Sequence, residues 1–258
     1  MDHQRRKFLK GAAALGAAAL TLPASSFQAM SETDRRSGPG GKGDGFSFLF
    51  QGDSITDGNR SRNNDWNHVM GHGYAYLIAS RLGYDHPAKQ FHFFNRGISG
   101  NKVPDLLQRW QVDTLDIKPD LLSILIGIND ASAAIGGAAE FTIERYEKEY
   151  RSLLQNTREQ LPSVQFVLCE PFILPVGKLK EKWDEYLADI SKRQRVIRRL
   201  AGEYDGIYVG LQNSFNKALS RAPADYWIWD GIHPMPAGHE LIAREWISQV
   251  AKRLKFIK

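Results

Sequence analysis

The sequence predicts an α/β fold, a three-layer α/β/α sandwich with a five-stranded parallel sheet between two layers of helices. Two observations predict it. Short apolar runs alternate along the chain with longer segments in which apolar residues recur at helical spacing. The apolar runs are also continuous, as in strands of a parallel sheet that are covered on both faces. Right-handed crossovers through the helices would then join successive parallel strands.

The first predicted strand is residues 46–51, in which four of the six residues are Phe or Leu, and a glycine follows it. Four later runs of similar character predict the remaining strands at residues 91–95, 121–126, 164–169 and 206–209. Segments with apolar residues at helical spacing predict helices at residues 73–82, 103–115, 142–160, 183–203 and 236–254.

Residues 1–30 are predicted to be an export signal and not part of the fold. Arg5, Arg6 and Lys7 precede an apolar stretch, residues 11–22, and small residues follow. Paired arginines of this kind resemble twin-arginine signals, which predicts an exported, periplasmic or extracellular protein. An ordinary secretory signal and an uncleaved anchor are the alternatives, although about 12 apolar residues are fewer than the roughly 20 that span a bilayer.

Residues 31–45 contain five glycines and a proline and are predicted to be a flexible linker, followed by one domain at residues 46–258. No later stretch is apolar enough to predict a membrane span. Without residues 1–30, which hold four Lys/Arg and one Asp, the formal charge falls from +5 to +2, so composition does not indicate a nucleic-acid partner. Cys169 is the only cysteine and is predicted to be a buried, inert thiol.

Polar or glycine-containing turns follow the predicted strands. Because the carboxyl ends of parallel strands meet at one edge of a sheet, we expect these turns to form one site. They are Gly52-Asp53-Ser54, residues 95–101, residues 127–130 and Glu170-Pro171-Phe172.

Asp230 and His233 stand three positions apart, just before the last predicted helix. Together with Ser54 they supply the parts of a serine hydrolase, since neutral histidine can take the proton of a serine hydroxyl as it attacks.

These motifs, in order, resemble those of the SGNH (GDSL) hydrolases: Gly52-Asp53-Ser54, Gly97, Gly127-Ile128-Asn129-Asp130 and Asp230-Gly231-Ile232-His233. The resemblance runs from residue 46 to the last helix. It implies a flavodoxin-like fold and hydrolysis of esters or thioesters through an acyl-enzyme. It further implies that Ser54 is the nucleophile, His233 the general base and Asp230 the residue that orients His233. The implied oxyanion hole consists of the backbone amides of Ser54 and Gly97 and the side-chain amide of Asn129.

Other enzyme classes fit less well. An α/β-hydrolase would carry a second glycine after the serine, and its histidine would lie far from its acid. A metal phosphoesterase is conceivable on Asp53, Asp57, Asp130 and Asp230, but histidines do not cluster at ligand spacing, so we expect no metal and no cofactor.

The substrate is expected to be a small-molecule or oligosaccharide ester. A polar loop, residues 59–68, carries Trp66, and Trp229 directly precedes Asp230; aromatic faces among polar side chains suit saccharides. Trp227 and Trp229 could equally pack as core. The candidate substrate-binding residues are Asp53, Trp66, Glu170 and Trp229.

Export and the polar loop favour removal of acetyl or other small acyl groups from saccharides. A lysophospholipase or thioesterase is the first alternative, with residues 171–175 as the wall of an acyl groove. The second is a carbohydrate-binding protein that keeps the fold without turnover.

Overall fold

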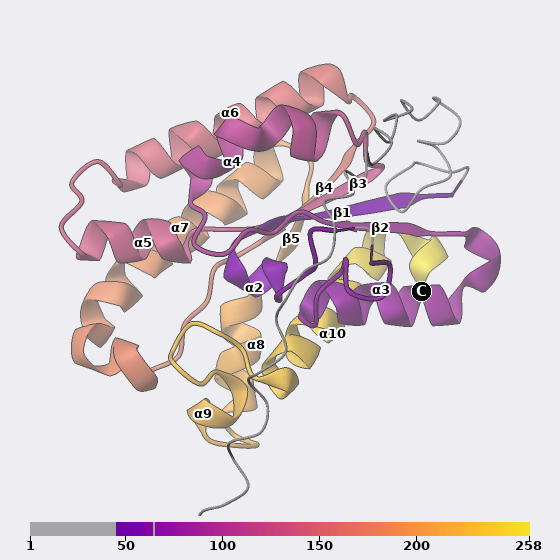
Figure 1. Ribbon diagram of the computed structural model, residues 1–258. Helices are drawn as coiled ribbons and strands as arrows, with labels where there is room; N and C mark the ends of the chain where they lie inside the picture. Colours follow the sequence, from indigo (N-terminus) through magenta and orange to yellow (C-terminus); the bar gives the residue numbers. More distant parts are fainter. Residues whose placement is uncertain (1–44, 64) are drawn as a thin grey trace, which may run out of the picture.

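The computed structural model describes residues 45–63 and 65–258. The predicted export signal and residues 31–44 of the predicted linker lie outside the described residues. The described part forms the predicted three layers, with the sheet in the middle (Figure 1). One layer holds helices α4, α5, α6 and α7, and the other holds α3, α8 and α10. The α/β sandwich expected from the sequence is confirmed.

The sheet is parallel throughout, with the strand order β2-β1-β3-β4-β5. Its strands are β1 (Ser47–Gly52), β2 (His92–Asn95), β3 (Leu121–Leu125), β4 (Gln165–Cys169) and β5 (Ile207–Val209), each within two residues of its predicted bounds. Their carboxyl ends lie in register, because Gly52 pairs with Leu125, Leu125 with Cys169, and Cys169 with Val209. The loops that follow four strands therefore begin at one edge of the sheet.

The long helices lie near their predicted positions. They are α3 (Tyr74–Asp85), α4 (Val103–Trp110), α6 (Ile143–Gln160), α7 (Trp183–Glu203) and α10 (Pro236–Arg253). The predicted helix 103–115 changes after residue 110 into a π-helical turn, Gln111–Leu115. Short helices that the sequence did not predict follow strand ends or precede the last loop: α2 (Ser54–Asp57), α5 (Ile128–Ile135), α8 (Leu211–Ala218) and α9 (Ala224–Trp227). They are too short for helical periodicity to be recognised.

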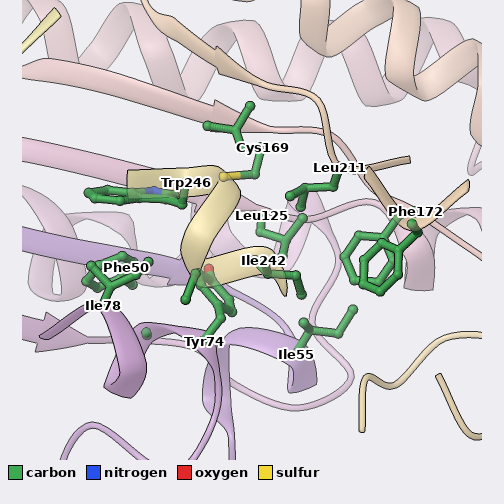
Figure 2. Close-up of a cluster of buried hydrophobic side chains, with 14 of the residues drawn as sticks. Phe50, Ile55, Tyr74, Ile78, Leu125, Cys169, Phe172, Leu211, Ile242 and Trp246 are labelled. Atoms are coloured by element: carbon green, nitrogen blue, oxygen red, sulfur yellow. The ribbon is translucent and has the colours of Figure 1, made fainter. Parts of the chain in front are cut away.

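Each face of the sheet carries its own apolar core. On the α3/α10 face, Trp246 and Tyr74 both pack against Phe50, at ring distances of 5.6 and 6.0 Å (Figure 2). The Trp246 indole donates a hydrogen bond to Ser123 in the sheet at 2.9 Å, so its one polar atom is satisfied. Cys169 is fully buried here, as predicted, and burial raises the pKa of its thiol to about 12.

Within residues 45–63 and 65–258, none of the helices combines the length and the apolar character needed to cross a bilayer.

Candidate active site

Ser54 stands where the first strand turns into a helix. β1 ends at Gly52, Asp53 caps the following turn, and α2 begins with Ser54. A Cβ atom on Gly52 would lie 2.3 Å from the carbonyl oxygen of Leu125, so only glycine fits this turn. Asp53 Oδ1 accepts the amide hydrogen of Ile55 at 3.0 Å and fixes the start of α2. The sequence thus presents the Ser54 hydroxyl at the carboxyl end of the sheet.

The Ser54 hydroxyl contacts a histidine from the other end of the chain. Its Oγ lies 2.9 Å from Nε2 of His233, and Nδ1 of His233 lies 2.8 Å from Oδ2 of Asp230. Oδ1 of Asp230 accepts the backbone amides of Ile232, at 3.0 Å, and of His233, at 2.7 Å. Burial alone would raise the pKa of Asp230, but these hydrogen bonds and the Lys178 ammonium hold it at about 2. The carboxylate is therefore ionised and fixed against the imidazole.

Two glycines allow close packing around the loop that carries Asp230. Gly231 has φ +94°, and a Cβ there would lie 2.6 Å from Cγ of Leu179. Gly177 has φ +57°, and a Cβ there would lie 2.5 Å from Cα of Asp230. The amide of Leu174 donates to the carbonyl of Gly231 at 3.1 Å. Segment 174–179 and the acid loop thus pack backbone to backbone, which leaves little room for the carboxylate to move.

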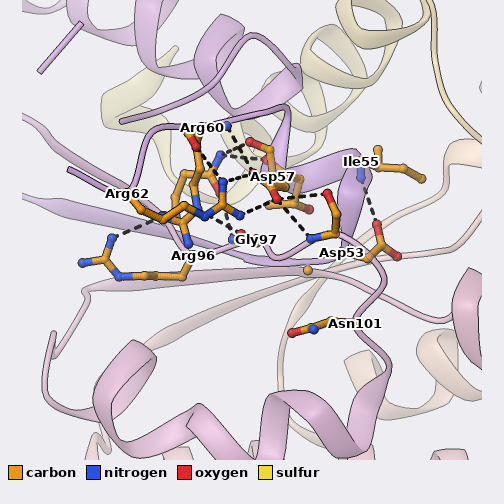
Figure 3. Close-up of polar contacts among 12 residues, drawn as sticks. Asp53, Ile55, Asp57, Arg60, Arg62, Arg96, Gly97 and Asn101 are labelled. Carbon is orange, nitrogen blue, oxygen red and sulfur yellow. Dashed lines mark hydrogen bonds and ion pairs between the residues drawn. The ribbon is translucent and has the colours of Figure 1, made fainter. Parts of the chain in front are cut away.

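Gly97 cannot hold an oxyanion as the resemblance implied. Its amide donates to Oδ1 of Asn95 at 2.9 Å, and its carbonyl accepts from Nε of Arg60 at 2.9 Å (Figure 3). A Cβ at residue 97 would lie 2.3 Å from the backbone nitrogen of Asp57. The glycine is therefore required for close packing against α2, and its amide is already used. The assignment of Gly97 to the oxyanion hole was wrong for this reason.

Gly100, in the same loop, has the properties that Gly97 lacks. It has φ +84°, no atom lies within 4 Å of its Cβ position, and its amide makes no hydrogen bond within the described residues. The Asn129 side-chain amide lies beside this loop, since its Nδ2 donates to the carbonyl of Asn101 at 3.0 Å. The second hydrogen of Nδ2 has no acceptor among the residues that the structure describes. The amide of Ser54, at the first position of α2, has no acceptor within the helix.

The structure divides the four candidate substrate-binding residues into two pairs. Asp53 is 1% exposed, and Glu170 is 5% exposed and accepts hydrogen bonds from Tyr208 and the Gln212 amide. Both carboxylates lie beneath the surface, so their prediction as substrate contacts was wrong. Trp66 and Trp229, in contrast, are 64% and 59% exposed.

The two tryptophans beside the acid loop have different environments. Trp227 is buried and belongs to the core, where its indole donates to the carbonyl of Ala222. The Trp229 ring stacks with His233 at a centroid distance of 6.4 Å and an interplanar angle of 27°. The core alternative therefore applies to Trp227 alone, and Trp229 offers an exposed aromatic face next to the histidine.

A second buried carboxylate, Asp130, lies under the site. Its Oδ1 accepts the amide of Val103 at 3.2 Å, and burial raises its pKa to about 6. Burial likewise raises the pKa of Asp53 to about 7, with a further contribution from the charge of Asp130. In the part of the chain that the structure describes, no three His, Cys, Asp or Glu side chains converge as they would around a metal ion.

Comparison with known proteins identifies two segments. Residues 50–241 match the GDSL-like Lipase/Acylhydrolase family, and residues 2–21 match the signal sequence of the twin-arginine translocation pathway. The chain thus carries a twin-arginine export signal, as predicted from Arg5 and Arg6.

Similar proteins include an acetylxylan esterase from Geobacillus stearothermophilus, which is 31% identical over 217 residues that cover 81% of this chain and 95% of the esterase. A multidomain esterase from Ruminococcus flavefaciens is 26% identical over 84% of this chain and 24% of that protein. Among solved structures, a GDSL-like lipase from Parabacteroides merdae is 41% identical with a TM-score of 0.77, over 80% of this chain and 95% of that one.

The solved structure of the Geobacillus acetylxylan esterase is 32% identical, with a TM-score of 0.71 over 81% of this chain and 95% of the esterase. Three variants of that esterase are described as catalytic mutants, with alanine in place of a serine, an aspartate or a histidine. In that esterase the aspartate and the histidine are three positions apart, which is the spacing between Asp230 and His233.

Proposed function

Because the chain belongs to the GDSL-like lipase/acylhydrolase family, we propose that it is an exported serine esterase that removes acetyl or other small acyl groups from saccharides. The observation that carries this proposal is the hydrogen-bonded series from Ser54 through His233 to Asp230, with distances of 2.9 and 2.8 Å. Nucleophile, base and orienting acid lie within hydrogen-bonding reach before any substrate binds.

In the first step, Oγ of Ser54 attacks the carbonyl carbon of the ester while Nε2 of His233 accepts the serine proton. The ionised carboxylate of Asp230 holds the imidazole with its proton on Nδ1 and stabilises the imidazolium that forms. His233 then gives its proton to the departing saccharide oxygen, and the carbon–oxygen ester bond breaks. The acyl group remains bonded to Ser54.

In the second step, water attacks the acyl carbon of Ser54 while His233 again takes a proton. The bond to Oγ breaks, the proton returns to the serine, and the carboxylic acid leaves. In both steps the carbonyl oxygen carries negative charge. The donors proposed for it are the amides of Ser54 and Gly100 and the free hydrogen of Asn129, all of them neutral and held by backbone structure.

Two features support a saccharide with a small acyl group. Trp229 presents an exposed face beside His233, where a sugar ring can stack. Phe172, Ile173 and Leu174, which were the candidate wall of a groove for a long acyl chain, are each at most 1% exposed and pack in the core. The lysophospholipase or thioesterase alternative therefore has no apolar wall from these residues. The relation to an acetylxylan esterase points to the same substrate class.

The test compares hydrolysis of p-nitrophenyl esters of increasing acyl length, and then of acetylated xylooligosaccharides, by the mature protein and by Ser54→Ala. Ser220→Ala is the matched control, because Ser220 is exposed and its hydroxyl donates to the carbonyl of Lys217 and not to a residue of the site. We expect activity on acetate, a steep fall with longer chains, and loss of at least about 10³-fold in Ser54→Ala alone. A preference for long chains would indicate the lipid or thioester alternative. Saccharide binding without Ser54-dependent turnover of any of these esters would indicate the binding-protein alternative.

A further inference from the structure

A cavity of about 440 Å³ lies beside the loop of Gly97, lined by the side chains of Arg60, Arg62 and Arg96 (Figure 3). We infer that this cavity is an anion subsite that binds the carboxylate of an acidic saccharide unit next to the esterified one. The inference rests on the proposed function for the identity of the ligand, because it makes the substrate an acidic acetylated oligosaccharide. The cavity itself is independent of that function.

Arg60 carries the central positive charge of the cavity. Its side chain is mostly enclosed, with 8% of the residue exposed, and its Nε donates to the carbonyl of Gly97 at 2.9 Å. In the part of the chain described, neither of its two terminal nitrogens has a hydrogen-bond or ion-pair partner. Burial, followed by the neighbouring charges of Arg62 and Arg96, lowers its pKa to about 10. These terminal nitrogens are not among the buried side-chain atoms that lack a partner, so they face the open cavity, where an anion can reach them.

The surrounding charges leave this guanidinium unbalanced. Arg62 binds both oxygens of Asp57, at 3.1 and 2.6 Å. Asp113 is shared by Arg96, at 3.7 Å, and Arg109, at 2.9 Å. Three arginines therefore line the cavity against one carboxylate, that of Asp113, and the cavity has room for a negative group. Arginine binds a planar carboxylate with two parallel hydrogen bonds, which makes a carboxylate a fitting occupant.

The remaining lining fits a sugar acid better than a bare ion. Val69, Phe93 and Ile98 add apolar surface that can cover a pyranose face. Ser61 also belongs to the lining, and its hydroxyl oxygen has no hydrogen-bond partner among the described residues. The volume lies in the range of small-molecule sites, roughly 300–1,000 Å³, and exceeds what an inorganic anion fills.

The cavity is connected to the proposed reaction centre along the chain, through α2 and through the loop that follows β2. Asp57, which Arg62 binds, ends the short helix that begins with Ser54. Ile98 lines the cavity and stands two residues before Gly100. The proposed subsite and the proposed reaction centre are therefore built on the same two segments of the chain, and on this ground the proposal places the acidic unit next to the esterified one.

The binding test uses the Ser54→Ala variant, so that turnover cannot affect it. Calorimetry compares xylotriose that carries one glucuronic acid unit with unsubstituted xylotriose. We expect the acidic ligand to bind at least about tenfold more tightly, and the difference to shrink as salt is added. Arg96 is partly exposed and Arg60 is buried. Arg96→Gln and Arg60→Gln should each reduce the difference in affinity between the two ligands to within about threefold. Arg195→Gln, an exposed arginine without partners among the described residues, is the control and should leave it intact.

A kinetic arm measures kcat/KM on acetylated acidic and neutral xylooligosaccharides with active protein. A preference for the acidic substrate that Arg96→Gln removes supports the subsite. Equal binding and equal kcat/KM for the two ligands would overturn it while leaving the esterase intact. Arg96-dependent binding of the acidic ligand by a protein without esterase activity would support the subsite and reject the proposed function. Tighter Arg96-dependent binding of inorganic phosphate than of the acidic ligand would overturn the carboxylate assignment.

Discussion

Nζ of Lys178 lies 3.1 Å from Oδ2 of Asp230, the same oxygen that faces Nδ1 of His233 at 2.8 Å. The carboxylate therefore interacts with an imidazole and an ammonium at once. The Lys178 side chain is 56% exposed, so solvent weakens its field, but the lysine still places a positive charge beside the ring that must become positive during the proposed reaction.

Replacing Lys178 by methionine should raise kcat at neutral pH by up to about threefold. Without the ammonium, the negative charge of Asp230 acts on the imidazole alone, so one positive charge fewer opposes the imidazolium that forms in the proposed transition state. Lys180→Met, which removes an exposed lysine two residues away in the sequence, should leave kcat unchanged. A fall in kcat for Lys178→Met would contradict this role.

Gly177→Ala should reduce both stability and turnover. The left-handed φ of +57° costs a non-glycine residue roughly 1–2 kcal/mol, and the new Cβ would press on Cα of Asp230. We expect a loss of that size or more in the free energy of unfolding and a fall in kcat larger than the change in KM, because the acid loop must shift.

Gly202→Ala is the matched control for this substitution, since no atom lies within 4 Å of its Cβ position and it stands in α7. It should be neutral or stabilise the protein by about 0.5–1 kcal/mol. Denaturant unfolding and ester hydrolysis, measured on both variants, make the comparison. If the two alanine variants had the same stability and the same rate of ester hydrolysis, Gly177 would not be needed to hold the acid loop in place.

Asn129→Ala should lower kcat by about 10²–10³-fold with little effect on KM, because the lost hydrogen bond forms mainly to the charged oxygen of the transition state. Asn213→Ala, on the exposed side of α8, controls for the loss of an asparagine. A change confined to KM would instead assign Asn129 to substrate binding.

The sequence predicted the parallel sheet and the meeting of distant residues because both follow from local patterns. Continuous apolar runs determine the strands, and parallel strands bring their carboxyl ends to one edge. Local patterns could not decide whether Gly97 or Gly100 is the oxyanion donor, because both glycines stand in one loop. Asn95, two residues before Gly97, was the available signal, because asparagine often accepts the amide two positions on.

Side-chain direction was the second source of error. Asp53 and Glu170 follow strand ends, as expected, but each turns inward to cap a backbone amide, that of Ile55 and that of Gln212. Their positions after strand ends predict that both residues lie at this edge of the sheet, but they do not predict the direction in which each carboxylate points. The contact between Lys178 and Asp230 depends on the packing of two loops remote in sequence, which no local pattern reports.

The buried carboxyl of Asp53 should make the protein less stable as pH rises. Burial raises its pKa from 3.8 to about 7, so the folded protein holds the proton more tightly than the unfolded chain. As pH rises from about 4 to about 7, the unfolded chain loses this proton first, and the contribution of Asp53 to stability falls until both forms are ionised. Asp53→Asn keeps an oxygen for the Ile55 amide and removes the titration.

The free energy of unfolding of Asp53→Asn, minus that of the unchanged protein, should therefore increase between pH 4.5 and pH 8. At about 1.4 kcal/mol per pKa unit, the increase is on the order of several kcal/mol. Taking the difference cancels the carboxylates that do not interact with Asp53, and leaves the titration of Asp53 together with its effect on Asp130. Asp225→Asn, at an exposed position of α9, should show the same difference at both pH values. A pH-independent difference for Asp53→Asn would mean that Asp53 is ionised in the folded protein throughout this range.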